Sequence, residues 1–318
     1  MKSMNQLIIT MMICLFSIQA WAQSGKLFNT DNQLSSNLAT QVFQDKSGFI
    51  WIATRNGLNT YDGYHITVTK KDMSNFPGLN SNYINSIAQD EKEHILLGTN
   101  NSLLEFTGSE FLKIPMLDSK GEELATYVKQ VYPLKNKDVA VATSGYGIML
   151  KKQDAQECHA MKGEVEKLKY IHKLLEDKRS RLWIIAEDGR LHRKETNGKI
   201  ISYFAGTEGV SAQDIQQDAL GNIYLASKNQ GVYLLRAGSN VFTRISNIGN
   251  LPIDNIYISR NNKLYIGSDG LGIYVYDPQT GFLQDNPLFS RLVNLAKSKV
   301  TSIIEDNQGN IWVSMLQK

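Results

Sequence analysis

The sequence contains few cysteines. Of its 318 residues only Cys14 and Cys158 carry a thiol, and Cys14 lies within the apolar stretch at the N-terminus. If that stretch is removed on export, Cys158 is left alone and no intrachain disulfide can form. We therefore expect the fold to be stabilised by burial of apolar side chains rather than by cross-links.

A surplus of charge of either sign is also missing. The chain carries 34 Lys and Arg residues against 31 Asp and Glu residues, a formal net charge of +3. Such a small net charge argues against nucleic acid or an acidic membrane surface as a partner. The densest charged segment, residues 161–181, mixes both signs. We interpret it as a solvated connection rather than as a site for a polyanion.

Apolar runs are short outside the N-terminus. Lys2 precedes an apolar run at residues 7–16, and Ala20-Trp21-Ala22 offers a cleavage site, which together predict a secretory signal peptide. The run is too short for a convincing membrane anchor. Ile13 stands where a lipobox before Cys14 would need a small residue. We expect cleavage after Ala22 and a periplasmic mature chain that makes no membrane contact.

Patterns typical of enzymes are absent as well. The five histidines are scattered, with no HExxH or other metal-ligand spacing. His172 and Glu176 are the nearest approach to such a pair, and we expect His172 to lie at the surface. Turn aspartates such as Asp45 and Asp306 recur as part of a repeat, so they do not indicate an acid–base pair. The sequence therefore predicts no catalytic residue, no metal and no cofactor, and the chain is expected not to be an enzyme.

The chain does have a motif that returns seven times, first and most clearly as DKSGFIWIATRNGLNTYDG at residues 45–63. Aligning the repeats on their aromatic position or its replacement gives one column: Trp51, Leu96, Ala140, Trp183, Tyr224, Tyr265 and Trp312. The intervals within this column run from 41 to 47 residues. This period, with short β-rich runs separated by turn residues, is typical of a propeller blade.

The first repeat predicts four strands: a run ending at Phe43, then 49–54, 58–62 and 65–70. Asp45 to Gly48 and Asn56-Gly57 supply turns, because Asp accepts hydrogen bonds from nearby amides and Gly adopts positive φ. The tryptophans Trp51, Trp183 and Trp312 recur once per repeat in the middle of the second strand. We therefore expect them to pack between blades rather than to serve as platforms for sugars.

The repeats predict an all-β fold, a seven-bladed β-propeller of four-stranded antiparallel blades that fills residues 23–318 after the signal peptide at 1–22. Residues 26–30 are expected to close the ring as the outermost strand of the last blade. Residues 300–306 and 311–315 would form that blade's two inner strands. Without a third strand, the last blade is expected to be incomplete.

A ligand-binding face follows from the strand order. In a four-stranded antiparallel blade, the loops joining the second and third strands lie on the same face as the segments between blades. Those loops and segments carry amides, both charge signs and aromatic rings, which suit sugar hydroxyls and sugar faces. The predicted ligand-binding residues are Arg55, Asn56, Asn100, Tyr146, Asp188, Lys228, Asn229 and Asp269.

Three segments carry a resemblance to a known family: NQLSSNLATQVFQDKSGFIWIATRNGLNTYDGYHITVTKKD at residues 32–72, LNSNYINSIAQD at 79–90 and VTSIIEDNQGNIWVS at 300–314. They resemble the two-component regulator propeller repeats in the sensor half of Bacteroidetes hybrid two-component systems. The repeats near Leu97, Val141 and Trp183 depart from that pattern.

The resemblance implies a periplasmic sensor that recognises oligosaccharides derived from polysaccharides and relays the signal to a histidine kinase. Such proteins look like two seven-bladed propellers, an immunoglobulin-like domain, a membrane helix in the inner membrane, a kinase, a receiver and a DNA-binding module. This chain would correspond to the first propeller, with the kinase lying outside it. The implied partners are an oligosaccharide ligand and a second propeller or sensor subunit.

Two other functional classes stay open. The GNIW and GNIY turns at Gly309 and Gly221 also look like those of seven-bladed lyases of the streptogramin lyase type, which use a metal and a histidine. GLNTYDG and the LSSN-like entries favour the sensor family. A periplasmic scaffold that binds proteins is the third class, because propellers often dock partners on one face.

Overall fold

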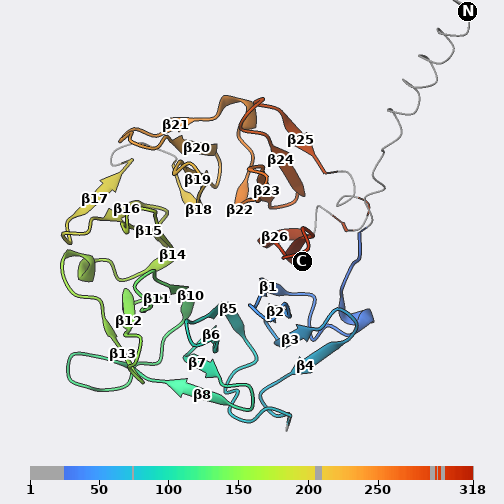
Figure 1. Cartoon of the computed structure of the whole chain (residues 1–318), viewed down its shortest axis with the longest axis vertical. Coiled ribbons are helices and arrows are strands. Elements are labelled where there is room, and N and C mark those ends of the chain that lie inside the picture. Colours follow the sequence, from blue (N-terminus) through green and yellow to red (C-terminus); the bar gives the residue numbers. More distant parts are fainter. Residues whose placement is uncertain are drawn as a thin grey trace, which may run out of the picture.

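In the computed structural model, antiparallel sheets are arranged in a ring around a central channel (Figure 1). The structure describes residues 25–73, 75–204, 210–286, 291, 293–294 and 298–317. The signal peptide expected at residues 1–22, with Cys14, lies outside these residues. The innermost strands are β1 (Ala39–Gln44), β5 (Ile84–Gln89), β10 (Val128–Pro133), β14 (Ile171–Glu176), β18 (Ala212–Gln217), β22 (Ile253–Ile258) and β26 (Ser298–Glu305). The second strands are β2 (Ile50–Thr54), β6 (Ile95–Thr99), β11 (Val139–Thr143), β15 (Leu182–Ala186), β19 (Ile223–Ser227), β23 (Leu264–Ser268) and β27 (Ile311–Gln317).

The outer strands belong to six of these sheets. The third strands are β3 (Gly57–Tyr61), β7 (Leu103–Phe106), β12 (Ile148–Lys151), β16 (Leu191–Lys194), β20 (Gly231–Leu235) and β24 (Ile273–Tyr276). The fourth strands are β4 (Ile66–Thr69), β8 (Phe111–Ile114), β13 (Cys158–Ala160), β17 (Ile200–Tyr203), β21 (Thr243–Arg244) and β25 (Leu283–Asp285). A fifth strand, β9 (Met116–Leu117), pairs in parallel with β13. The short 3-10 helices are η1 (Thr30–Asn32), η2 (Glu164–Lys167) and η3 (Ser246–Ile248).

The expected seven blades of four strands are not what forms. Six sheets contain four or five strands, whereas β26 and β27 form a sheet of two, so the structure is a six-bladed propeller with an additional two-stranded sheet in the ring. The strands β26 and β27 do cover the two segments in which we expected inner strands. Outer strands are what this sheet lacks among the described residues.

Closure of the ring by an N-terminal strand is also wrong. Residues 26–29 form no strand, and the chain then enters η1. The reason is that a fourth strand needs a third to pair with, and apart from a single bridge between Leu38 and Leu316 no described strand lies on the outer edge of β27. The N-terminal segment packs through rings instead: Phe28 stacks on Trp312 with their ring centroids 5.6 Å apart.

Side chains on the inner strands close the ring instead. The Thr301 hydroxyl of β26 donates to the carbonyl of Ala39 in β1 at 2.8 Å. The Asn307 amide, in the turn after β26, donates to the Gln44 side chain at 2.7 Å. The same bond, from a turn amide to the last side chain of the next inner strand, joins Lys178 to Gln217 at 2.7 Å. The two-stranded sheet is therefore linked to β1 as other neighbouring sheets are linked.

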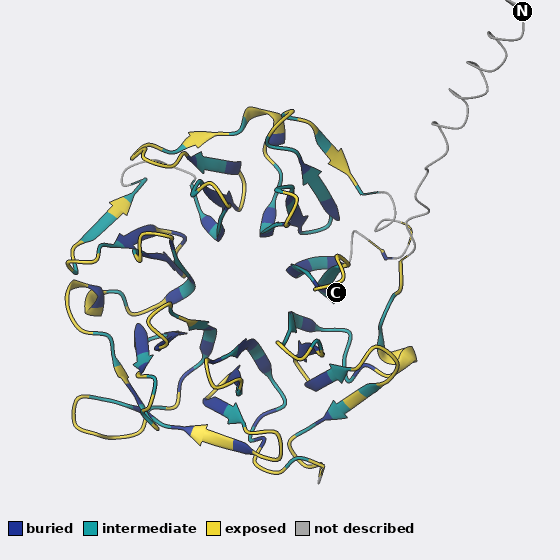
Figure 2. Ribbon diagram, viewed as in Figure 1, coloured by how far each residue is buried: buried dark blue, intermediate teal, exposed yellow. Residues whose placement is uncertain are grey.

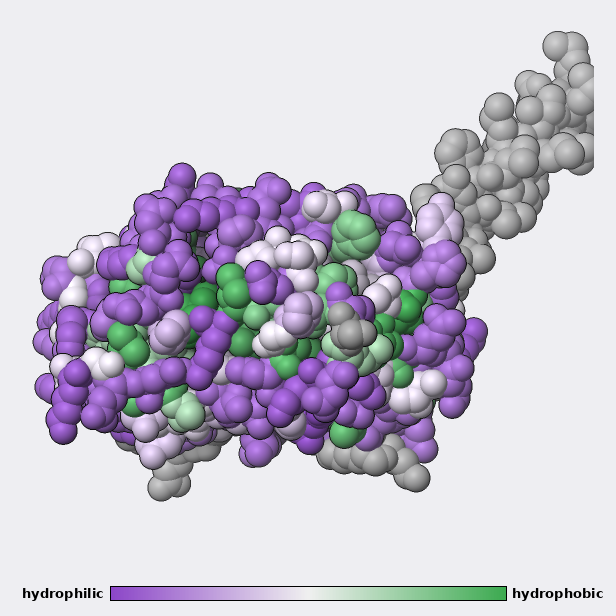
Figure 3. All heavy atoms as spheres, turned by 90° about the horizontal axis from the view of Figure 1, so that it is seen from below, coloured by the Kyte–Doolittle hydropathy of each residue, from purple (hydrophilic) through white to green (hydrophobic). Residues whose placement is uncertain are grey.

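The second strands form the core. All five residues are buried in β2, β6, β11, β15 and β19. These strands are fully buried because each has a paired strand on both edges and a neighbouring sheet on both faces, which excludes solvent. Figure 2 shows this burial concentrated on the inner strands, with exposed residues towards the outer strands and loops. In the edge-on view of Figure 3, hydrophilic residues cover both rims of the disc and apolar residues appear in the band between them.

The motif tryptophans are structural, as expected. Trp51 and Trp183 are buried, and Trp312 is half-buried. Each indole Nε1 donates to the aspartate that opens its own turn, to Asp45 at 2.7 Å and to Asp177 at 2.9 Å. The indole of Trp312 bonds to Asp306 in the same way at 2.8 Å. One aspartate thus caps the turn and satisfies the buried indole, so the turn and the core depend on each other.

Candidate functional site

The predicted site residues all lie in turns between second and third strands, as the strand order required. Local hydrogen bonds explain why these turns form: the Thr54 hydroxyl donates to the carbonyl of Gly57 at 2.7 Å and accepts from the amide of Asn56 at 3.0 Å. Thr143 and Ser268 make the same carbonyl bond in their turns. The turns are fixed by their ends, which leaves their middle side chains exposed on one face. We call this the turn face.

Aromatic and charged side chains meet on the turn face where the first four blades approach the channel. The Arg55 guanidinium lies over the Tyr83 ring, 5.5 Å from its centroid, and Tyr83 meets Tyr127 edge to face at 6.0 Å. The Lys129 ammonium lies 4.7 Å from the Tyr127 centroid and 3.3 Å from a carboxylate oxygen of Glu187. We call Arg55, Tyr83, Tyr127, Lys129 and Glu187 the rim cluster.

The tyrosines of the rim cluster are held in place by the blades beneath them. The Tyr127 hydroxyl donates to the side chain of Asn85 in β5 at 2.8 Å. Burial raises the pKa of Tyr127, and its hydrogen bond with Tyr83 raises it further. The phenol therefore stays neutral throughout the physiological range and remains a hydrogen-bond donor. A positioned ring with a neutral hydroxyl can both stack on and hydrogen-bond a polyol.

A ring of polar side chains lines the wall of the central channel. Every innermost strand shows a register shift at its second residue, or at the equivalent point of β26, which marks a bulge. Bulges re-aim side chains. The bulge residues, which we call the channel ring, are Thr40, Asn85, Lys129, His172, Gln213, Asp254 and Thr301.

Part of the channel ring joins neighbouring sheets. The Thr40 hydroxyl donates to the carbonyl of Ile84 at 2.5 Å, and the Asn85 amide group donates to that of Val128 at 3.0 Å. Thr301 makes the equivalent bond to Ala39. These uncharged members hold one inner strand to the next, so their role is structural.

Two titratable members of the channel ring, Asp254 and His172, are partly buried, and burial shifts the pKa of each. Asp254 pairs with Lys299 of β26 at 2.7 Å, and burial raises the pKa of the Asp254 carboxyl despite that lysine. Burial and the charge of Lys173 lower the pKa of His172 to about 4. His172 is therefore neutral at physiological pH. It lies in the channel wall, not at the surface where we expected it.

The structure brings only some of the predicted residues together. Arg55 belongs to the rim cluster. Lys228 and Asp269 lie close enough to Asp254 to influence its pKa, which places them at a second charged group on the opposite side of the channel mouth. Asp269 also bridges the backbone of Lys299.

The other five predicted residues lie apart from these groups. The side chain of Asn100 accepts a hydrogen bond from Ser81 at 2.7 Å, and Asp188 pairs with its turn neighbour Arg190 at 2.6 Å. Asn56, Tyr146 and Asn229 are exposed in their turns. All eight residues therefore lie on the turn face that the strand order predicted, but three of them fall into two groups and five lie apart. Ligand binding on this face stays a prediction.

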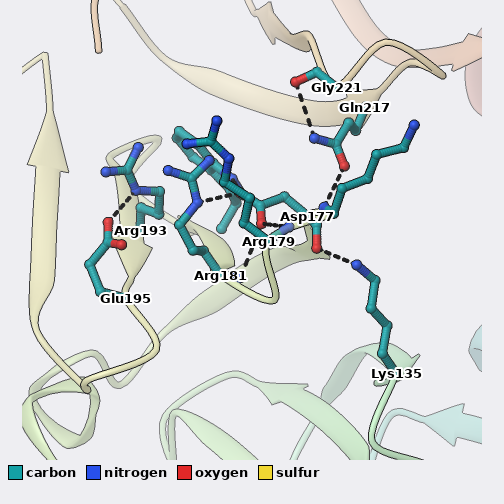
Figure 4. Close-up of polar contacts among 10 residues, drawn as sticks. Lys135, Asp177, Arg179, Arg181, Arg193, Glu195, Gln217 and Gly221 are labelled. Atoms are coloured by element: carbon teal, nitrogen blue, oxygen red, sulfur yellow. Dashed lines mark hydrogen bonds and ion pairs between the residues drawn. The ribbon is translucent and has the colours of Figure 1, made fainter. Parts of the chain in front are cut away.

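The opposite face carries the turns between first and second strands and is built for stability. Figure 4 shows Asp177 at the centre of one such turn. Its carboxylate accepts from the amide of Arg179 at 2.9 Å and from the guanidinium of Arg181 at 2.7 Å. Burial opposes ionisation, but these bonds and that from Trp183 hold the pKa of Asp177 below its usual value. Figure 4 also shows Arg193 bonded to Glu195, close by in the same blade.

No group of three or more His, Cys, Asp or Glu residues in the described part of the chain is arranged to hold a metal ion. The helices described there include none with the length and apolarity that a membrane span needs.

Comparison with known proteins identifies the repeats. Two segments, residues 33–56 and 294–317, match the family model of the two-component regulator propeller. These two segments are two-component regulator propeller repeats. This confirms the resemblance inferred from the first and last repeats.

Solved structures share the fold. The propeller is similar to the extracellular domain of a putative hybrid two-component system from B. thetaiotaomicron, with 22% identity, a TM-score of 0.77, and 92% of this chain and 40% of that chain covered. A second such extracellular domain from the same organism shows 16% identity and a TM-score of 0.73, with 87% and 39% covered. The chain thus spans about two-fifths of their length.

Virginiamycin B lyase from Staphylococcus aureus has a similar fold, with 13% identity and a TM-score of 0.68 over 91% of this chain and 94% of that one. No curated protein matches the sequence. At these identities the structural likenesses show the fold alone.

The sequence of each repeat also contains a signal for the channel ring. Each member of the channel ring lies eleven residues before the aligned aromatic position of its repeat. A second polar residue follows it directly within an otherwise apolar strand, as in ATQV at residues 39–42 and IDNI at 253–256. Two adjacent polar residues break the alternation of a strand and indicate a bulge. The pairing of Lys129 with Glu187 has no such signal, because it depends on how far apart two blades stand.

Proposed function

We propose that this propeller is the periplasmic sensor domain of a hybrid two-component system and binds an oligosaccharide derived from a polysaccharide on its turn face. It would bind without turnover and relay the signal to a kinase outside this chain. The similarity to extracellular domains of hybrid two-component systems supports the class of protein. The rim cluster is the observation that supports the ligand class.

The rim cluster has the chemistry that sugar recognition requires. The faces of Tyr83 and Tyr127 offer apolar area to the C–H groups of a sugar ring, while Arg55, Lys129 and Glu187 offer charged donors and an acceptor for its hydroxyls. The mutual contacts of these side chains hold them before a ligand arrives. Preorganisation of this kind lowers the entropic cost of binding.

The proposal is tested by a thermal-shift screen of the chain against plant, host and fungal oligosaccharides. A ligand at about a hundredfold excess over its dissociation constant should raise the free energy of unfolding by about 2.7 kcal/mol. Tyr127→Ala should weaken binding at least tenfold, whereas Tyr127→Phe keeps the ring and should weaken it much less. Arg179→Ala on the opposite face is the matched control and should bind as the wild type does.

Substitution in a full-length sensor separates recognition from stability. The double substitution Arg55→Ala and Asp269→Ala removes one charge from each group of the turn face. Neither side chain belongs to the buried core. The double variant should weaken the response to ligand while leaving the melting temperature nearly unchanged. A response that survives this pair but is lost with Arg179→Ala would place the site on the opposite face.

The propeller lyase remains the second candidate, because the similar fold of virginiamycin B lyase covers nearly the whole chain. Incubation with a streptogramin B antibiotic and divalent metal distinguishes the two. Linearised product formed by this chain would contradict binding without turnover.

A further inference from the structure

A small cleft lies on the face opposite the turn face, between the blade of β14–β17 and the blade of β18–β21. It has a volume of about 120 Å³. The turn after β14 lines one side, and the turns after β18 and β20 line the other. The described residues that line it include no aspartate or glutamate but three arginines: Arg179, Arg181 and Arg236. We call this site the arginine cleft.

The guanidinium groups of the arginine cleft are largely without partners. Arg179 and Arg236 are exposed, and neither forms a salt bridge with any described residue. Arg181 uses only its Nε, which donates to Asp177 at 2.7 Å, and its terminal nitrogens make no hydrogen bond in the described part of the chain. Figure 4 shows Arg179 and Arg181 on the same turn. Most of the donors of the three side chains therefore remain available to a ligand.

Neighbouring carboxylates do not neutralise the cleft. Asp177 is buried and already accepts from the Trp183 indole as well as from its own turn. Asp218, in the turn after β18, is also buried and accepts from the amide of Asn222 at 2.8 Å and from its side chain at 2.7 Å. Glu195 pairs with an arginine of β16 at 2.5 Å. Each acid is engaged within its own blade, so the cleft keeps an excess of positive charge.

Other blades show why Arg236 is unusual at its position, directly after the third strand. In the blade of β22–β25 the equivalent residue is Asp277, which pairs with Lys263 at 2.5 Å. In the blade of β10–β13 it is Lys152, which pairs with Asp138 at 2.8 Å. In both blades the partner is the residue directly before the second strand. An uncharged asparagine stands there in the blade of β18–β21, so Arg236 lacks the neutralising partner that the equivalent residue has in those two blades.

The size and shape of the cleft limit what it can bind. Its volume is far below the roughly 300–1,000 Å³ of sites for drug-sized ligands, so it suits one small group rather than a sugar chain. Guanidinium groups bind phosphate and sulfate oxygens through paired hydrogen bonds. A tetrahedral anion presents oxygens in more than one plane and can meet arginines from both sides, whereas the two oxygens of a carboxylate share a plane. The buried side chains of Ile223 and Leu235 provide low-dielectric walls that strengthen the field of the arginines.

We propose that the arginine cleft binds a small tetrahedral oxyanion, a phosphate or sulfate group, either as the free ion or as an ester of a larger molecule. Arg179 and Arg181 hold the anion from one blade and Arg236 holds it from the next, so the bound anion links the two blades. The site is separate from the turn face and does not depend on the function proposed for that face.

The experiment titrates the full chain with sodium sulfate or sodium phosphate while sodium chloride keeps the ionic strength constant. The melting temperature should rise and then saturate, as expected for a ligand that binds a site in the folded state. Both salts also stabilise proteins by exclusion from their surface. That effect does not saturate and should be alike in all variants, so the saturating increment measures the site.

Glucose 6-phosphate and glucose 6-sulfate, with glucose as the neutral control, distinguish the two sources of the anion. Saturation by an ester at a lower concentration than by the free ion would show that the cleft takes the group as part of a larger molecule. Saturation by the free ion at the lower concentration would show that it takes the inorganic anion. Glucose alone should produce no saturating increment.

Two substitutions of Ser239 give a matched pair. Ser239 lines the cleft, and its hydroxyl accepts from the amide of Val241 at 3.1 Å, a bond that an aspartate or asparagine oxygen can also accept. Ser239→Asp places a negative charge among the arginines and should weaken anion binding about tenfold or more, because it competes for charged hydrogen bonds. Ser239→Asn has nearly the same shape without the charge and should bind the anion as the wild type does.

Loss of an arginine tests the site from the other direction. Arg236→Ala should weaken sulfate binding about tenfold, since a hydrogen bond to a charged group contributes about that much. Arg190→Ala removes an exposed arginine that pairs with Asp188 on the turn face, and it should leave sulfate binding unchanged. The melting temperatures in chloride alone show that each variant is folded. A stabilisation by sulfate and phosphate that never saturates, or one that is equal in the wild type, Ser239→Asp and Arg236→Ala, would overturn the proposal.

Discussion

The blade of β14–β17 and the sheet of β26 and β27 have similar inner strand pairs but differ in their outer strands. In both, a turn aspartate accepts from the indole of the motif tryptophan, Asp177 from Trp183 and Asp306 from Trp312. Both are linked to the next sheet by side chains of the innermost strand. Among the described residues, only the blade has a third and a fourth strand.

The two tryptophans show how much burial the outer strands contribute. Trp183 has no exposed surface and is covered by Tyr203 of β17, 5.2 Å away between ring centroids, and by the Arg193 guanidinium of β16 at 5.1 Å. Trp312 contacts the rings of Phe28 and Tyr61 but stays half-buried. The inner strand pair is thus sufficient to hold a sheet in the ring, and the outer pair is needed to bury the aromatic column.

The largest expected difference between the two regions is at the tryptophans. Trp183→Ala removes a fully buried ring and leaves Asp177 without its indole donor, so it should lower the free energy of unfolding by about 3–5 kcal/mol. Trp312→Ala should cost about half as much, because part of that ring is already in solvent. Urea denaturation of both variants measures this, and equal losses would show that Trp312 is buried as completely as Trp183.

The packing of β26 against its neighbour is expected to match the packing between inner strands elsewhere in the ring. An added Cβ at Gly98 would overlap Val128 of the next inner strand, and one at Gly267 would overlap Val300 of β26. Gly98→Ala and Gly267→Ala should therefore each destabilise by about 1–3 kcal/mol through overpacking. A clearly smaller loss at Gly267 in the same urea assay would mean that β26 packs loosely.

Closure by side chains predicts a smaller effect at Gln44. Its side chain accepts from the Asn307 amide across the point where the ring closes, as Gln217 accepts from the Lys178 amide within the ring. Gln44→Ala and Gln217→Ala should each cost about 0.5–1.5 kcal/mol, the usual net value of a hydrogen bond. If Gln44→Ala changes nothing, the ring must be closed by other means.

The smallest effect at neutral pH concerns His172 in the channel wall. Its pKa is lowered from 6.5 to about 4 by burial and by Lys173, so the unfolded chain binds a proton between these values and the folded chain does not. The contribution of His172 to stability is therefore complete above pH 6.5 and falls as the pH drops towards 4. An NMR titration of the ring that gave a pKa near 6.5 would contradict its burial.

Sequence reasoning predicted the local structure well and the global closure poorly. The spacing of Asp, Gly and Trp fixes turns and second strands, because each depends on residues within one repeat. The two inner strands of the last sheet were predicted, but its closure depends on contacts between the two ends of the chain, such as Phe28 with Trp312, for which the repeat has no signal. The turn face followed from strand order, whereas the rim cluster depends on distances between blades.

Hydrogen exchange along β27 and β15 tests most directly the claim that one sheet of the ring lacks its outer half. The amides of β15 should all be protected, since this strand pairs on both edges. In β27 every second amide should be protected by β26. The alternate amides should exchange as fast as those of exposed loops, except that of Gln317, which donates to the carbonyl of Asn37. Uniform protection of β27 in the isolated chain would contradict the account, because it would require a strand already paired with its outer edge.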